Sequence, residues 1–66
     1  MNVNKFKKYI GKHVTVSTPY FSNKHRLCFI TGVVLEVKNN HMLIKYNRNS
    51  LRRIALSDII NIRVEG

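Results

Sequence analysis

The chain of 66 residues is poor in acidic side chains, with three Asp and Glu against twelve Lys and Arg. It also has one cysteine, one proline and no tryptophan. One cysteine cannot form an internal disulfide, and Cys28 lies in an apolar run, so we expect a buried small hydrophobe in a reducing compartment. No apolar run reaches about 18 residues, which excludes a transmembrane helix. The basic start MNVNKFKKYIG precedes no long apolar segment, so it is not a signal peptide.

The scarcity of acids also argues against an enzyme. Hydrolytic acid–base catalysis usually needs paired carboxylates, or a histidine and an acid within hydrogen-bond reach. The acids Glu36, Asp58 and Glu65 are separated along the chain, and the three histidines are widely spaced with no second cysteine to complete a zinc site. A glycine-rich phosphate loop is absent as well. The sequence therefore predicts no catalytic residue, no metal and no cofactor.

The stretch from Leu27 to Tyr46 predicts two strands joined by a tight turn. Its apolar residues are mostly β-branched, and such side chains fit a pleated, half-buried surface better than a helix. Asn39 and Asn40 tolerate the positive φ angles that a short hairpin turn needs. Both faces of the second strand hold some apolar surface, which favours a position inside the sheet rather than at its edge.

Gly32 lies inside the first of these two strands. After it, Val33, Leu35 and Val37 form a wholly apolar face, which we expect to point inward. Before it the alternation is less clean. A glycine in a strand often marks a bulge or bend, so we predict that the inward-facing parity shifts at Gly32. The alternative is a plain strand that the glycine weakens.

The segment before this hairpin predicts a short helix and a first strand. Asn2 or Asn4 can cap the helix and Gly11 can end it, with Phe6 and Ile10 packing on one end of the sheet. The strand runs from Lys12 to Thr18 and is ended by a proline. We expect its two valines to face inward. The residues expected outward are His13, Thr15 and Ser17.

The segment after the hairpin predicts a second turn over Asn47 to Ser50 and a fourth strand from Leu51 to Leu56. Ser57 and Asp58 form a single helical turn that Ser57 caps. A fifth strand follows, and we expect three of its apolar residues to face inward. They are Ile60, Ile62 and Val64.

Five short strands with tight turns and one short helix predict a mainly β fold. We expect a small, five-stranded, strongly bent barrel of the SH3-like or Sm-like type with a short N-terminal helix. Residues 1–66 form one domain. A domain of this size buries only about 60% of the surface of its unfolded chain, so it must pack well or oligomerise to be stable.

The net charge of +9 predicts an anionic partner, because unbalanced charge costs self-repulsion. Tyr20 and Phe21 lie beside three cationic side chains in one predicted loop, an arrangement that suits stacking on unpaired bases. The alternatives are that the cations are merely solvated and that one ring anchors the loop. The predicted nucleic-acid-binding residues are Lys5, Lys8, Lys12, Tyr20, Phe21, Lys24, Arg26, Arg48, Arg52 and Arg53.

The run Thr31-Gly32-Val33-Val34, then Val37, the strand around Ile44 and the segment from Ile54 to Ile62 resemble YolD-like proteins. These are small bacterial and phage-borne proteins linked with DNA-damage polymerases. The resemblance covers about residues 29 to 64 and implies a fold and a mobile-element setting, in the cytoplasm of a bacterium or of a phage-infected cell. The chain also resembles Sm-like RNA-binding proteins. The base-binding motif that comes second in those proteins is not recognisable here.

Two functions therefore stay open. The first is a non-enzymatic module that binds DNA or RNA, with Lys and Arg on phosphates and aromatic rings on bases. The second is a protein-interaction module of a phage or mobile element that docks on an acidic host protein. A continuous basic face with a central aromatic ring favours the first, and scattered charge beside an apolar patch favours the second. A membrane partner is not expected, because the only amphipathic segment is too short.

Overall fold

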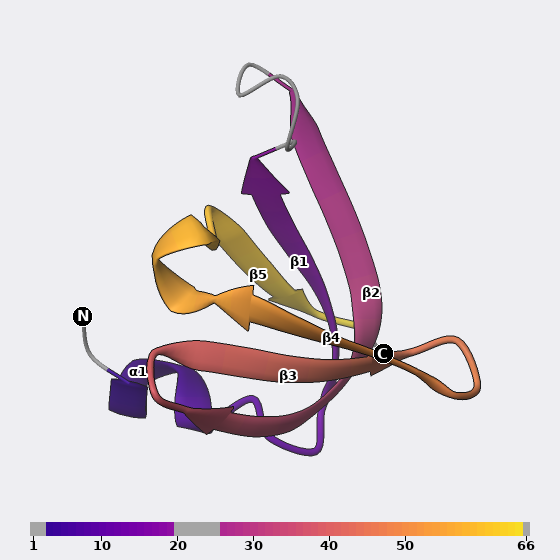
Figure 1. The fold of residues 1–66 in the computed structure, drawn as a ribbon, viewed down its shortest axis with the longest axis horizontal. Coiled ribbons are helices and arrows are strands. Elements are labelled where there is room, and N and C mark those ends of the chain that lie inside the picture. The colour runs from indigo at the N-terminus through magenta and orange to yellow at the C-terminus, as the bar shows by residue number, and fades with distance from the viewer. Residues whose placement is uncertain (1–2, 20–25, 66) are drawn as a thin grey trace.

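The fold is a single antiparallel sheet with one short helix at its end. The computed structural model describes residues 3–19 and 26–65. In chain order its elements are α1 (Val3–Lys7), β1 (His13–Pro19), β2 (Leu27–Lys38), β3 (His41–Tyr46), β4 (Ser50–Ala55), the 3-10 helix η1 (Leu56–Asp58) and β5 (Asn61–Val64). The strand order is β4-β3-β2-β1-β5 (Figure 1). The predicted mainly β class is confirmed. Among the described residues β4 and β5 are the two edges of the sheet, so the expected closure into a barrel stays a prediction.

The β2–β3 hairpin is confirmed where the two asparagines predict it. Asn39 and Asn40 have φ angles of 52° and 61°, in the left-handed region that asparagine tolerates better than most residues. Directly before and after the turn, Lys38 pairs with His41 and Val37 with Met42. β3 lies between β2 and β4, as its two partly apolar faces indicated.

The predicted parity shift occurs in β2, but its predicted position is wrong. Ile30 and Val34 are buried, so the inward parity passes through Gly32 unchanged. The register shift lies between Val34 and Glu36, where Leu35 is the extra residue of a bulge and is exposed. Beyond it the inward residue is Val37. A bulge adds one residue to one strand, so every later side chain changes face.

The core is formed by apolar side chains from α1, four strands and η1. Its buried members are Phe6, Val14, Val16, Ile30, Val34, Val37, Met42, Ile44, Ile54 and Leu56. Cys28 is partly buried and packs against this cluster, close to the predicted environment. Phe6 reaches the core from α1 as predicted, whereas Ile10 is exposed and Tyr9 packs there instead. The backbone around Ile10, rather than its side chain, meets β2, because it bridges to Val34.

The expectation that three apolar residues of the last strand face inward is corrected. Ile60 and Val64 are exposed, and of the three only Ile62 packs against the core, because β5 has a partner strand on one side only. Ser17 is on the predicted outward side of β1, opposite in parity to Val14 and Val16, but it is buried. Its strand is paired on both sides, with Phe29 and Asn61 directly across from it, so neighbouring residues cover it.

The predicted helical turn after β4 is confirmed as η1, but the predicted cap is wrong. η1 begins at Leu56, and the residue before it is Ala55, which has an extended backbone and no side chain to accept a hydrogen bond. Ser57 lies inside the turn rather than before it, so its hydroxyl is in the wrong place to cap. The turn is held instead by the buried Leu56 side chain and by the Leu56 amide, which donates to the Asn40 carbonyl at 2.9 Å.

Candidate nucleic-acid interface

Most of the cationic side chains in the described residues have no carboxylate partner. Lys38 lies 3.6 Å from Glu36, and the Arg63 Nε donates to Glu65 at 3.1 Å. Eleven of the twelve cations are described, and these two pairs leave nine, all of them exposed. The nine are Lys5, Lys7, Lys8, Lys12, Arg26, Lys45, Arg48, Arg52 and Arg53. They keep the full charge with which to attract an anion.

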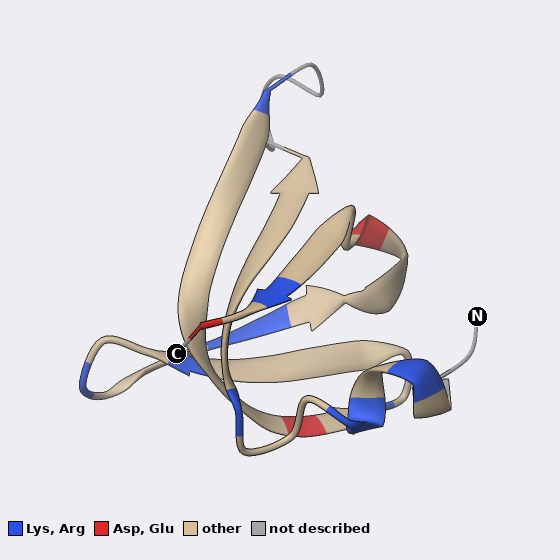
Figure 2. Ribbon diagram, turned by 180° about the vertical axis from the view of Figure 1, so that it is seen from behind, with Lys and Arg blue, Asp and Glu red and all other residues tan. Residues whose placement is uncertain are grey.

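The predicted binding residues do not form one basic face. Lys5 and Lys8 lie in and just after α1, and Lys12 follows shortly. Arg48 is in the β3–β4 turn and Arg26 directly precedes β2. Figure 2 shows these segments at separate corners of a molecule that measures 30 × 29 × 20 Å. The residues Tyr20, Phe21 and Lys24 lie outside the described part of the chain, so their role stays a prediction.

Arg52 and Arg53, which the sequence places side by side, lie on opposite sides of β4. Arg53 is directly across from Leu43, and Arg52 is across from the fully buried Ile44. Successive side chains of a strand point to opposite faces. Arg53 therefore belongs to the outer face, which we define as the side of the sheet turned away from the core. Arg52 lies on the inner side and is exposed, because β4 is an edge strand.

The outer face of β2 presents an exposed aromatic ring among apolar residues. Phe29 is 64% exposed, and Leu27 on the same side of the strand is 45% exposed. Val33 lies further along this side, and Lys45 of β3 is directly across from it. The alternation before Gly32 is too weak to assign Phe29 to the inner or the outer face from the sequence alone. Its opposite parity from the inward Cys28 and Ile30 is the signal that could have revealed it.

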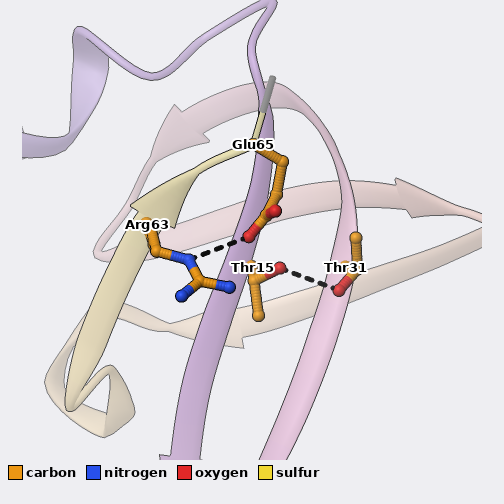
Figure 3. Close-up of polar contacts among 4 residues, drawn as sticks. All are labelled: Thr15, Thr31, Arg63 and Glu65. Carbon is orange, nitrogen blue, oxygen red and sulfur yellow. Dashed lines mark hydrogen bonds and ion pairs between the residues drawn. The ribbon is translucent and has the colours of Figure 1, made fainter.

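A polar network lies beside these outer-face residues of β2, where β1 pairs with β2 on one side and with β5 on the other (Figure 3). The Thr15 and Thr31 hydroxyl oxygens are 2.9 Å apart. Hydrogen bonding by the Thr15 side chain and then by Arg63 lowers the pKa of the Glu65 carboxyl below its ordinary value of 4.5. Because a hydroxyl has one proton, a Thr15 that donates to Glu65 must accept its other hydrogen bond from Thr31.

We predict that Thr15→Val raises the pKa of Glu65 toward the ordinary value, measured by NMR titration of the carboxyl carbon. The native pKa is the lower one, so Glu65 stabilises the fold above about pH 4.5, and that contribution is lost as the pH falls through the native pKa. Thr31→Val is the control, because it leaves Thr15 free to donate, and we expect a smaller shift. Equal shifts in both variants would contradict the proposed chain of donors.

No protein-family model, curated protein or solved structure matches this chain. The resemblance to YolD-like proteins and the barrel type therefore stay predictions. Among residues 3–19 and 26–65, no group of three or more His, Cys, Asp or Glu is placed to hold a metal ion. The same residues contain no helix with the length and apolar character needed to cross a membrane.

Proposed function

We propose that this protein is a non-enzymatic module that binds single-stranded nucleic acid on the outer face of its sheet. In this proposal the Phe29 ring stacks on a base, and cations around it contact phosphates. The observation that supports it is the exposed Phe29 ring on a face that also holds Lys45 and Arg53, neither of which has an ion pair within residues 3–19 and 26–65. Base stacking on an aromatic ring is worth about 1–3 kcal/mol and tolerates any base.

A single strand fits this surface better than a duplex. An exposed ring can stack only on a base that has left its pair, and duplex readout places a helix or a two-stranded ribbon in a groove. α1 has five residues, too few for a recognition helix, and no carboxylate in the described part of the chain pairs with its lysines. Lys5, Lys8 and Lys12, with Arg26 and Arg48, then steer the polyanion from the corners of the molecule.

A second candidate is docking on an acidic protein. Exposed apolar residues favour it, because Leu27 and Phe29 on β2 and Leu51 on β4 are each about half exposed or more, and the cations are distributed over several corners. Contacts between apolar side chains depend weakly on salt. Phosphate contacts release counterions and therefore depend on it strongly. Docking on an acidic protein through the same cations also weakens with salt, so binding to DNA or RNA itself separates the two candidates.

The experiment is a binding titration of labelled single-stranded and duplex DNA and RNA across a range of salt concentrations. We expect single strands to bind best, with a log–log salt slope of about −0.7 for each phosphate contacted. Phe29→Ala should weaken binding about tenfold, because it removes one stacking platform. Phe29→Leu is the matched control, since it keeps an apolar side chain but loses the ring.

Equal weakening by the two Phe29 variants supports stacking. If Phe29→Leu binds as well as the wild type, the ring serves only as apolar surface and the stacking contact is wrong. No binding of any polymer at low salt would remove the nucleic-acid function and leave protein docking.

A further inference from the structure

A hollow on the outer face gathers charged side chains from three neighbouring strands. It lies at the end of the β2–β3 hairpin and is lined by Glu36, Lys38, Asn39, His41, Leu43 and Arg53. The strand register explains the grouping. Leu43 lies between Glu36 on one side and Arg53 on the other, and Lys38 is across from His41. β2, β3 and β4 therefore each bring one basic side chain to the same place.

The charges of the hollow leave Arg53 available for an anion. The Glu36 carboxylate has Lys38 as its partner at 3.6 Å. Arg53 is across from Leu43, which has no charge, so its guanidinium has no ion pair among the described residues. Lys38 and Arg53 against Glu36 give the hollow a net charge of +1 while His41 is neutral. A guanidinium has five N–H donors in a fork that matches the oxygens of a phosphate group.

His41 is held in one orientation by the hairpin turn. Its Nδ1 lies 2.8 Å from the Asn39 carbonyl oxygen, which can only accept, so Nδ1 carries the proton. Asn39 is one of the two turn residues and has a φ angle of 52°. Protonation of His41 would add a second donor at Nε2 and a second positive charge.

We infer that this hollow is a phosphate-binding subsite in which Arg53 and His41 are the principal ligands. The inference rests on the proposed function, because the hollow lies on the face that carries Phe29. The phosphate is either a phosphodiester of the bound strand or a terminal phosphate monoester. Lys38 screens the nearby Glu36 carboxylate, which otherwise repels the anion.

The first test is an NMR titration with inorganic phosphate at constant ionic strength, in which phosphate replaces chloride. We expect saturable shifts at the Arg53 Nε–H and at the His41 ring. Arg53→Gln should weaken phosphate binding about tenfold or more, since hydrogen bonds to charged groups are the strong ones. Arg52→Gln is the matched control. It removes the same charge one residue away, on the other side of β4, and should leave binding unchanged.

The second test separates the two sources of phosphate with oligonucleotides that have a 5′-phosphate or a 5′-hydroxyl group. A preference for the 5′-phosphate that Arg53→Gln removes assigns a terminal monoester. Equal affinities that Arg53→Gln lowers together assign a backbone phosphodiester. Phosphate shifts that are alike at every cation, or equal losses in the Arg52 and Arg53 variants, overturn the subsite.

The two proposals fail separately. Oligonucleotide binding that depends on Phe29 but not on Arg53 leaves the nucleic-acid function standing without the subsite. Inorganic phosphate that binds at Arg53 and His41, with no oligonucleotide binding, leaves the subsite without that function.

Discussion

Gly32→Ala is expected to destabilise the fold by about 3 kcal/mol or more, because its methyl group has no room. A Cβ atom at this position would overlap the backbone carbonyl oxygen of Lys45 and lie 2.7 Å from Cγ2 of Ile44. Ile44 is fully buried, and Lys45 is paired with β2 on one side and with β4 on the other. Neither can move aside without breaking the pairing of the central strands.

The size of this effect is large for so small a protein. At about 0.05–0.15 kcal/mol per residue, a domain of this length has a total stability of roughly 3–10 kcal/mol. We therefore expect chemical denaturation to show a fold that is mostly lost, or a midpoint shifted far down. Gly11→Ala is the control. Gly11 has a φ of 85° and no atom within 4 Å of an added Cβ, so it tests backbone strain without overlap.

We expect Gly11→Ala to cost only about 1–2 kcal/mol, the usual cost of a left-handed backbone with a side chain. If Gly32→Ala is as stable as the wild type, β2 and β3 are not packed as closely as the approach of the Lys45 carbonyl and the Ile44 side chain to Gly32 indicates.

Leu56→Ala is expected to cost about 2–5 kcal/mol, the range for truncating a buried leucine. Leu56 is 1% exposed, and it is the residue by which η1 reaches the core. Its amide also ties η1 to the hairpin turn at Asn40. Truncation leaves a cavity where β4 gives way to β5, so we expect β5 to lose protection from hydrogen exchange before β2 and β3 do.

Ser57→Ala is the matched control for the same turn. Ser57 is exposed and no side chain caps η1, so its loss should change the unfolding free energy by less than about 0.5 kcal/mol. A cost near that of a lost helix cap, about 1 kcal/mol, would restore the capping role predicted from the sequence.

Arg52 and Arg53 show why only part of the candidate site could be predicted from the sequence. Their alternation along a strand follows from the sequence, because successive side chains of a strand point to opposite faces. Which of the two cations lies near other basic side chains depends on β3, because Leu43 and Ile44 are their neighbours across the sheet. Arg53 thereby joins Lys38 and His41, residues 12 to 15 positions earlier in the chain. No local sequence pattern predicts that these three residues lie close together.

Leu35 and Phe29 show the same limit for the fold. Leu35 belongs to an apolar alternation and was expected inward, yet a bulge turns it out. Phe29 was left without an assigned face, and it is the most exposed of the large apolar residues in the described part of the chain. A bulge can form at any of several positions along a strand, because these positions differ little in local conformational preference. The position that is used depends on which partner packs best.

The amino-acid sequence by itself determined the mainly β class, the Asn39-Asn40 turn, the helical turn after β4 and the excess of positive charge. Each of these depends on neighbours along the chain, through side-chain alternation, the conformational range of asparagine, or simple counting. The tertiary structure alone decided where β2 bulges, which apolar residues the edge strands leave exposed and which cations share the outer face. Those outcomes depend on strand register, because register sets which residues from distant parts of the chain become neighbours.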